Sequence, residues 1–404
     1  MKPGLFQRLV LASLRGLKEG HLELACPNGT WAFGQGDAEL RARVRVHDLS
    51  VFRLAVLQGE VGLGDARMLG LWEADDLVTV VRIAVRNMAA FDRAGGLLAT
   101  LGKALNRLRH RRRGNTVEGS RENISRHYDL GNDFYRLWLD ATMAYSCAVY
   151  AREGEDLEMA QLRKFDRICG KLRLGPEDHL LEIGTGWGGF AAHAAAAYGC
   201  RVTTTTLSRE QHAKAAELFK AKGLDDRIEL RLEDYRHLGG TYDKAVSIEM
   251  FEAVGLEHYG DYFSAVDRLL KPGGIFLMQT ITMNERSFPG YIRASDWIQR
   301  RIFPGAELAS VLEIQRSLAA STRMALFDLE DIGTHYARTL AEWRRRFTAA
   351  LDQIRAQGFD ETFIRMWDYY LASCEGAFLE RHISDVQLLI AKEGHPGPLL
   401  AEPW

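Results

Sequence analysis

His179-Leu-Leu-Glu-Ile-Gly-Thr-Gly-Trp-Gly-Gly-Phe190 is a short apolar run that passes into a glycine-rich turn and then into an alanine-rich segment. This order predicts a β-strand, a tight turn and an α-helix. The glycines allow the backbone to pass close to a ligand where a Cβ would collide, and the free N–H groups of the helix point into the same space. Such turns serve dinucleotides, S-adenosylmethionine and plain helix–strand packing alike, so the turn alone leaves the ligand open.

The composition limits the classes of protein that come into question. The chain has 404 residues, of which 47% are hydrophobic and 26% charged, which leaves room for two globular domains. A net charge of −2 predicts no general attraction to nucleic acid. The five cysteines lack the spacing of a disulfide framework or a metal site, so we expect no metal and a reducing cytoplasm. The apolar stretch Leu9–Leu14 is too short to span a bilayer.

The chain divides near residue 115. Residues 1–115 are predicted to form a small α+β domain, with strand-like alternation at Ala42–His47, followed by the basic segment Lys103–Gly114. This segment fits either a solvated linker or a contact with anionic phospholipid, where each basic residue near the membrane contributes about 1 kcal/mol. Residues 116–404 form the second predicted domain.

Short apolar strands and helices alternate regularly after residue 160. The predicted strands are His179–Ile183, Arg201–Thr206, Ile228–Leu232, Asp243–Ser247 and Ile275–Thr282, and the predicted helices are Gly188–Tyr198, Arg209–Lys222 and Tyr259–Leu270. We expect Val386–Ala391 to return as an antiparallel strand beside the fifth. The order predicts an α/β fold of the class I methyltransferase type, with a doubly wound, mostly parallel seven-stranded sheet and its ligand at the carboxyl ends of the strands.

The ends of the second and third strands separate two cofactor classes. A dinucleotide enzyme places Asp or Glu after the second strand to hold the ribose, yet this strand ends in Thr203-Thr-Thr-Thr-Leu-Ser-Arg-Glu-Gln211 without an acid at its tip. The third strand ends in Leu-Glu-Asp-Tyr235, which suits an adenine ring. S-adenosylmethionine is therefore favoured, with dinucleotide binding as the alternative.

Five separated motifs resemble the cyclopropane-fatty-acyl-phospholipid synthase family, which includes enzymes of the mycolic acid cyclopropane synthase type. They occur in the family's order: Arg126–Tyr135, Met143–Ala148, Glu182–Gly189, Met250–Gly255 and Trp297–Gly305. The resemblance covers residues 120 to 390. The N-terminal hundred residues resemble, with fewer motifs, the smaller lipid-binding domain of two-domain bacterial members.

The resemblance implies methyl transfer from S-adenosylmethionine to the double bond of an unsaturated acyl chain in a phospholipid. A carbocation forms on the chain, and a base then removes a proton to give a cyclopropane or a methylene- or methyl-branched chain. The cation requires an apolar pocket that excludes water, to which the aromatic residues Tyr128, Phe134 and Tyr135 are candidate contributors or simply core. The resemblance also implies a cytoplasmic protein on the inner membrane face, and a homodimer.

In the family the base is a bicarbonate ion held by a Cys, a Glu, a His, a Tyr and a backbone group. The matching positions are Cys147, Glu252, Tyr336 and the backbone of Ile281. The His position is Gln279, which can donate through its amide but carries no charge.

Two further departures lie beside this motif. Ala253 replaces a common His, and Glu249 stands where Gly is usual. A carboxylate at 249 repels an anion or replaces it, so we hypothesise that Glu249 or Glu252 takes over part of the role of bicarbonate. The alternative is that Glu249 points away and bonds a ribose hydroxyl or an arginine.

The resemblance also assigns contacts to S-adenosylmethionine. Tyr145 and Ser146 approach the methionine end, and Gly184 and Gly186 its carboxylate side. The remaining assigned residues approach the ribose (Thr206, Leu207, Gln211) and the adenine (Asp234, Tyr235).

Two other functions stay open from the sequence. One is a methyltransferase of the same fold that acts on a small soluble substrate and has no need of the basic segment. The other is a catalytically impaired lipid-binding homologue, for which Gln279 is the motivating residue.

Overall fold

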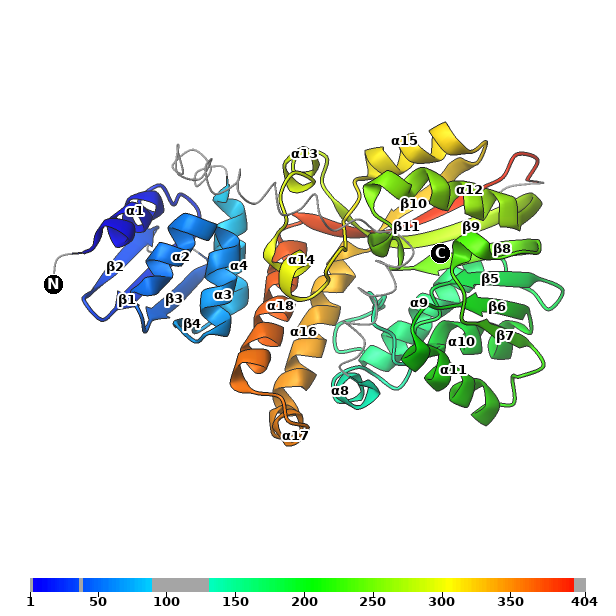
Figure 1. The fold of residues 1–404 in the computed structure, drawn as a ribbon, viewed down its shortest axis with the longest axis horizontal. Helices are drawn as coiled ribbons and strands as arrows, with labels where there is room; N and C mark the ends of the chain where they lie inside the picture. The colour runs from blue at the N-terminus through cyan, green and yellow to red at the C-terminus, as the bar shows by residue number, and fades with distance from the viewer. Residues whose placement is uncertain (1–2, 36–38, 89–130, 396–404) are drawn as a thin grey trace. The chain divides into compact units, whose positions relative to one another are not determined.

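The structure is a computed structural model that describes residues 3–35, 39–88 and 131–395, and the chain forms two compact units (Figure 1). The larger unit comprises residues 114–288, 305–339 and 383–404, and the smaller comprises residues 1–113, 289–304 and 340–382. The predicted boundary near residue 115, the basic segment Lys103–Gly114, Tyr128 and the start of the Arg126–Tyr135 motif lie outside the described residues. The assignment of separate functions to two domains stays a prediction.

The larger unit is built on a seven-stranded sheet in the order β10-β11-β9-β8-β5-β6-β7. The strands are β5 (His179–Ile183), β6 (Arg201–Thr205), β7 (Ile228–Arg231), β8 (Tyr242–Ile248), β9 (Leu270–Met283), β10 (Ala325–Asp331) and β11 (Ile383–Ala391). β7, β6, β5, β8 and β9 run parallel, and β11 pairs antiparallel with both β9 and β10. The predicted α/β fold and the antiparallel return beside the fifth strand are confirmed.

Helices cover both faces of this sheet (Figure 1). They are α8 (Asn132–Arg136), α9 (Leu157–Lys171), α10 (Gly189–Tyr198), α11 (Arg209–Ala221), α12 (Tyr259–Leu269), α15 (Val311–Ser321) and α16 (Gly333–Ala349), whose last residues belong to the smaller unit, with short helices η1 (Tyr235–His237), η2 (Phe251–Ala253) and η3 (Leu256–His258). Central strands such as β5 are buried on both faces, as parallel strands between helices are.

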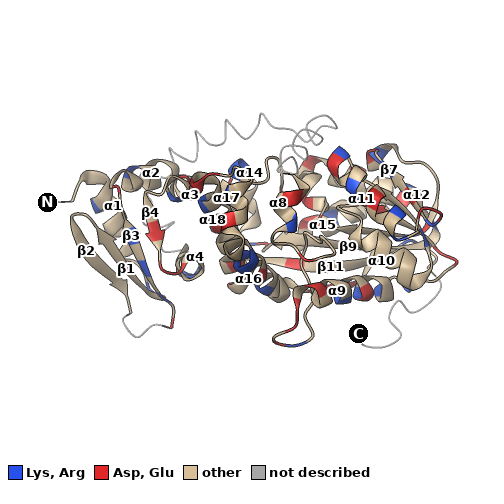
Figure 2. Ribbon diagram, turned by 90° about the horizontal axis from the view of Figure 1, so that it is seen from below, with Lys and Arg blue, Asp and Glu red and all other residues tan. Residues whose placement is uncertain are grey.

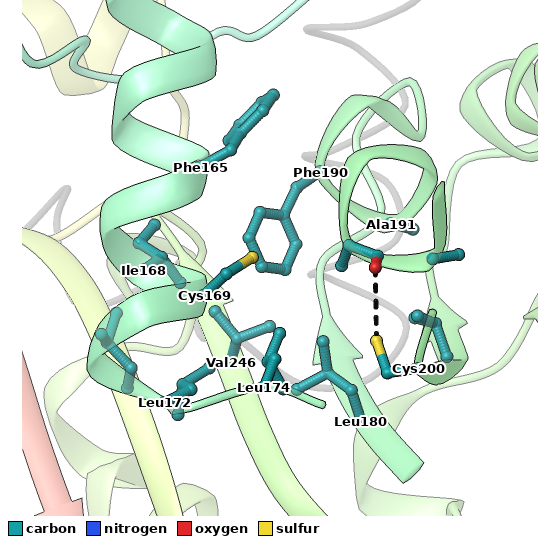
Figure 3. Close-up of a cluster of buried hydrophobic side chains, with 14 of the residues drawn as sticks. Phe165, Ile168, Cys169, Leu172, Leu174, Leu180, Phe190, Ala191, Cys200 and Val246 are labelled. Atoms are coloured by element: carbon teal, nitrogen blue, oxygen red, sulfur yellow. Dashed lines mark hydrogen bonds between the residues drawn. The ribbon is translucent and has the colours of Figure 1, made fainter. Parts of the chain in front are cut away.

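Each face of the sheet has its own core. On one face α9 and α10 pack over β5, where the rings of Phe165 and Phe190 meet edge to face at 5.5 Å (Figure 3). The thiol of Cys200 donates to the carbonyl of Ala194, so this cysteine is a buried packing residue. On the other face α12 and α15 supply the aromatic and aliphatic side chains that cover the sheet. These two cores fix the carboxyl ends of the strands relative to one another.

The fifth strand begins earlier than predicted. β9 pairs with β8 at Leu270 and again from Ile275, and the pairing shifts between these residues. The intervening Lys271-Pro-Gly-Gly274 loops out of the ladder because Pro lacks the N–H that pairing needs.

The smaller unit contains a four-stranded sheet in the order β2-β1-β3-β4. Its elements are α1 (Leu5–Leu14), β1 (His21–Cys26), β2 (Gly29–Gly34), β3 (Arg41–Val46), α2 (Ser50–Gln58), α3 (Glu60–Met68), β4 (Trp72–Ala74), α4 (Leu77–Arg86), α13 (Phe288–Tyr291), α14 (Trp297–Arg301), α17 (Leu351–Ala356) and α18 (Glu361–Leu379). The indole of Trp297 lies against Gly64 and donates to Asp65, so the Trp297–Gly305 motif begins by packing on α3.

Charge is mixed over the surface of the larger unit. Both α9 and α11 carry acidic and basic residues along their length, in line with the small net charge (Figure 2). Within the described residues, none of the helices has the length and apolar character needed to cross a bilayer.

The turn after β5 generates a prediction about folding. Gly188 has φ 87°, and a Cβ there would lie 2.8 Å from Cε1 of Phe219 and 3.1 Å from Cβ of Ala215. Gly188→Ala therefore costs about 1–2 kcal/mol for the left-handed backbone and a further ~1–3 kcal/mol for overpacking. We expect a clearly lower denaturant midpoint.

Gly223→Ala is the matched control for this change. Gly223 has φ 63°, but a Cβ there would meet no atom within 4 Å, so only the backbone cost applies. Equal losses of stability in the two variants would contradict the packing of α10 on α11.

Candidate active site

The candidate site lies at the carboxyl ends of the parallel strands. The chain leaves β5 into the turn Gly184–Gly188, and β5 lies between β6 on one side and β8 on the other. Connections from neighbouring strands diverge at such a point and leave a crevice in which α/β proteins bind ligands. The residues after β6, β7 and β8 line the same edge, and most of the predicted site residues belong to these segments.

The turn after β5 is shaped for close approach of a ligand. Gly184 and Gly186 have φ values of 104° and 52°, and a Cβ added at Gly186 would meet no atom within 4 Å. The turn is tied to β6 because the amides of Gly184 and Thr185 both donate to the carbonyl of Thr205. Open space above a rigid glycine backbone fits the carboxylate and ribose of S-adenosylmethionine.

The segment after β6 presents a buried polar pair. The hydroxyl of Thr206 donates to Oε1 of Gln211 at 2.8 Å, and both side chains are buried. The hydroxyl of Ser208 accepts from the backbone N–H of Gln211 and caps α11. Leu207 between them is partly exposed. The side-chain carbonyl of Gln211 accepts from Thr206, and its side-chain NH₂ group can donate to a ribose hydroxyl.

Asp234 and Tyr235 follow β7, where adenine binding was predicted. Both carboxylate oxygens of Asp234 bind the guanidinium of Arg236, at 2.9 and 2.7 Å, and this interaction holds its pKa below the usual value despite desolvation. The ring of Tyr235 packs edge to face on Tyr262. An adenine amino group that binds Asp234 therefore shares this carboxylate with Arg236.

The segment before α9 holds the residues predicted for the methionine end. The ring of Tyr145 packs beside Tyr135 and Trp138, whose side chains are fully buried. Phe134 is also fully buried, so Phe134 and Tyr135 are core residues. Ser146 is held from α9, because its carbonyl accepts from Gln161 and its hydroxyl from Lys164, at 2.8 and 2.7 Å.

Glu249 points into the group of residues that were predicted to hold bicarbonate. Its Oε1 accepts from the backbone N–H of Cys147 at 2.7 Å and from the amide of Gln279 at 2.8 Å. Its Oε2 accepts from the hydroxyl of Tyr336 at 2.5 Å. The alternative orientation, in which Glu249 points away to a ribose hydroxyl or an arginine, is wrong. Desolvation raises the pKa of Glu249, while Tyr336 and Cys147 lower it.

The backbone of Glu249 explains why glycine is usual at this position. Its φ is 48°, in the left-handed region that costs an ordinary residue about 1–2 kcal/mol. The backbone N–H of Glu249 donates to the carbonyl of Gln279 and fixes this conformation at the end of β8. Strain of this kind persists where surrounding contacts determine the conformation, often at functional sites.

Glu252 forms a second carboxylate beside the first. Its Oε1 accepts from the backbone N–H of Ile281 at 2.6 Å and from the hydroxyl of Thr280 at 2.9 Å. Its Oε2 is buried, and no hydrogen-bond partner for it is found among the described residues. Desolvation and the charge of Glu249 raise the pKa of Glu252 to about 7.

These contacts leave little provision for a separate bicarbonate ion. The donors of Cys147, Gln279 and Tyr336 are directed at Glu249, and the amide of Ile281 is directed at Glu252. The thiol of Cys147 donates to the carbonyl of Ala148 at 3.2 Å, and burial raises its pKa well above the usual value. The residues therefore do not fit bicarbonate as an additional group.

Several polar residues that the motifs did not indicate also belong to this cluster. Asp385 on β11 accepts from the amide of Gln279 at 3.0 Å, and Gln387 donates to the carbonyl of Gln279 at 3.0 Å. Lys164 on α9 is fully buried. A lysine on the apolar face of an amphipathic helix, and two polar residues at alternate positions of an apolar strand, were the available signals.

Comparison with known proteins identifies the family. The family model for mycolic acid cyclopropane synthetase matches residues 116–388. The chain belongs to this family. The tuberculostearic acid methyltransferase UfaA1 of Mycobacterium tuberculosis is 36% identical over 357 residues, which cover 84% of this chain and 80% of that protein. The cyclopropane-fatty-acyl-phospholipid synthase of Escherichia coli K12 is 38% identical over 355 residues, which cover 87% and 88%.

A solved structure agrees with this assignment. Mycolic acid cyclopropane synthase CmaA1, complexed with SAH and CTAB, superposes with a TM-score of 0.63 at 31% identity and covers 67% of this chain and 98% of that chain. The chain is therefore an S-adenosylmethionine-dependent methyltransferase of the cyclopropane synthetase family, and the prediction of this cofactor over a dinucleotide is confirmed.

The glycine turn generates a prediction about cofactor binding. In Gly186→Ala the new methyl group enters the open space beside the turn, so we expect the affinity for S-adenosylmethionine to fall by about tenfold or more, as measured by calorimetry. Gly223→Ala carries a similar backbone cost after the C-terminal end of α11, and this variant should retain wild-type affinity. Unchanged binding in Gly186→Ala would remove the turn from the cofactor site.

Proposed function

We propose that this enzyme transfers a methyl group from S-adenosylmethionine to the double bond of an unsaturated acyl chain in a phospholipid and closes a cyclopropane ring, with Glu249 as the base. The observation that carries the proposal is the Glu249 carboxylate, which accepts hydrogen bonds from Cys147, Gln279 and Tyr336. The names of the two curated relatives support a lipid substrate.

The two relatives differ in product, which fits a shared first step. One is named a tuberculostearic acid methyltransferase and the other a cyclopropane-fatty-acyl-phospholipid synthase. Methylation of the double bond leads to either outcome: loss of a proton from the added methyl group closes a ring, whereas a hydride shift followed by loss of a proton gives a methylene branch, which a separate reductant would convert into a methyl branch. A fixed carboxylate that removes the proton from the added methyl group favours the ring.

In the proposed reaction, residues of this chain remove the proton and orient the base. S-adenosylmethionine supplies an electrophilic methyl group when it is bound. The π electrons of the alkene form the new carbon–carbon bond as the sulfur–carbon bond breaks, and the neighbouring carbon becomes cationic. Glu249 takes a proton from the new methyl group, and the released electron pair closes the ring. Tyr336 and the amide of Cys147 keep the carboxylate aimed during this step.

Glu252 is proposed to stabilise the cation. Its Oε1 is held by Ile281 and Thr280, whereas its Oε2 has no hydrogen-bond partner among the described residues. An ionised carboxylate close to a carbocation offsets the cost of forming that charge away from water. Because its pKa is about 7, Glu252 is largely ionised only in mildly alkaline solution.

The remaining proposals concern the location, the domain functions and the oligomeric state of the enzyme. Phospholipid chains are reached at the membrane surface, so we place the enzyme in the cytoplasm, peripheral on the inner membrane face, with residues 1–115 as the lipid-binding-like domain and residues 116–404 as the methyltransferase domain. A homodimer is the proposed oligomeric state.

The first test of this function is lipid analysis. Mass spectrometry of membrane fatty acids from cells that express the chain should show a gain of one CH₂ on monounsaturated chains, and fragmentation should locate a ring. Glu249→Gln should reduce turnover by about 10²–10⁴-fold, the usual contribution of a general base, while calorimetry shows unchanged binding of S-adenosylmethionine.

Glu257→Gln serves as the control because this glutamate is exposed, with 68% of its side-chain surface accessible. Full activity of Glu249→Gln would contradict its role as the base. Methylation of a soluble molecule without lipid would support the small-substrate alternative, and absence of S-adenosylmethionine binding in the wild type would support the impaired homologue.

A further inference from the structure

The carboxyl group of Asp385 lies in the same cluster as the proposed base. One nitrogen, Nε2 of Gln279, donates to Oε1 of Glu249 at 2.8 Å and to Oδ2 of Asp385 at 3.0 Å. Gln387 fixes the orientation of this amide by donating to its carbonyl oxygen. Two carboxyl groups that share one donor repel one another strongly when both are ionised, so a proton is expected on one of them.

The hydrogen bonds show which carboxyl group is better suited to carry the charge. Glu249 accepts three hydrogen bonds, from the amide of Cys147, the amide of Gln279 and the hydroxyl of Tyr336. Asp385 is fully buried, and it accepts from the amide of Gln279 and lies within hydrogen-bonding reach of the Cys147 thiol, which is a weak donor. Among the described residues no N–H or O–H group donates to its Oδ1. Hydrogen bonds to a carboxylate favour its charged form, so the proton belongs on Asp385.

The contact between the two carboxyl groups supports this assignment. Asp385 and Glu249 lie within hydrogen-bonding reach of one another, and two carboxyl groups can form that bond only when one of them carries a proton. Burial, followed by the charges of Glu249 and Glu252, raises the pKa of Asp385 well above the usual value.

Lys164 supplies the opposite charge. Its side chain is fully buried, and its Nζ donates to Oγ of Ser146 at 2.7 Å. The next residue, Cys147, directs its backbone N–H at Glu249. Burial lowers the pKa of Lys164, while the charge of Glu249 is the largest influence that raises it. A buried ammonium group without nearby anions is costly, so Lys164 and the carboxylate stabilise one another.

We propose that Asp385, which is buried, holds the proton of the carboxyl pair that it forms with Glu249, and that Lys164 keeps Glu249 ionised and able to act as a base. This inference rests on the proposed function for its kinetic consequence only. Both residues are positioning residues, since they act through Glu249. The titratable groups that interact with Lys164, Glu249 or Asp385 come from other segments of the larger unit and are Asp140, Cys147, Glu182, Glu252 and Tyr336.

The kinetic test is the acid limb of the pH–rate profile in single-turnover assays. Glu249 and Glu252 both act in the ionised form, so activity rises with pH through their pKa values, and a change in the pKa of Glu249 moves this limb. Lys164→Met removes the cation and destabilises the carboxylate, so the acid limb should move to higher pH. At a pH below the limb, each unit of this shift corresponds to about a tenfold loss of activity. Activity should recover in alkaline solution, which a general loss of structure does not allow.

Lys171→Met is the matched control. Lys171 is the other fully buried lysine of α9, but its Nζ pairs with Glu330 on β10 at 2.7 Å. Its replacement should leave the acid limb in place. An equal shift in both variants, or a uniform loss at every pH in Lys164→Met, would overturn the role of Lys164.

The proton itself is tested by infrared difference spectroscopy, without lipid. Asp385→Asn should remove a C=O stretching band of a protonated carboxylic acid, whereas Glu249→Gln should remove carboxylate bands only. Asparagine has the same zero charge as protonated aspartate, so Asp385→Asn should also keep the acid limb in place. Loss of the acid band in Glu249→Gln, or an acid limb that moves to lower pH in Asp385→Asn, would overturn the assignment. An enzyme that lacks lipid activity but shows these bands would contradict the proposed function alone.

Discussion

The interactions of the Glu249 carboxylate determine how the active site of this protein is arranged. A half-buried carboxylate is stabilised by hydrogen bonds and by a nearby cation, and the chain supplies them from separate segments. Cys147 precedes α9, Gln279 lies on β9 and Tyr336 on α16. The parallel sheet places these segments at one edge, so the fold and the position of the charge depend on each other.

The same carboxylate accounts for an unfavourable backbone conformation. Glu249 occupies the left-handed region with φ 48°, where glycine has no steric cost. Three hydrogen bonds, each contributing about 1.5–3 kcal/mol when one partner is charged, are sufficient to offset a strain of about 1–2 kcal/mol. The carboxylate of Glu249 accepts hydrogen bonds from Cys147, Gln279 and Tyr336, which would otherwise donate to a bound anion. A separate anion is therefore unnecessary.

The sequence predicted the sheet well because apolar strands and helices alternate without long insertions between His179 and Leu270. It did not indicate β10, an edge strand in which exposed and partly buried residues alternate and two hydrophobic side chains, Phe327 and Leu329, are exposed. Departures from the family motifs drew attention to Glu249 and Gln279, but no motif could show what the Glu249 side chain contacts. Lys164 and Asp385 were missed because their importance arises only when α9 and β11 meet the end of β8.

The central claim is that Glu249 takes the place of bicarbonate, and the most direct measurement is the dependence of lipid methylation on bicarbonate in the wild type and in Glu249→Gly. The wild type should keep full activity in bicarbonate-free buffer. Glu249→Gly relieves the backbone strain and frees the donors of Cys147, Gln279 and Tyr336 to hold a small anion. We predict that this variant is inactive without bicarbonate and regains activity in a saturable manner when bicarbonate is added. A wild-type enzyme that loses activity when bicarbonate is removed would contradict the claim.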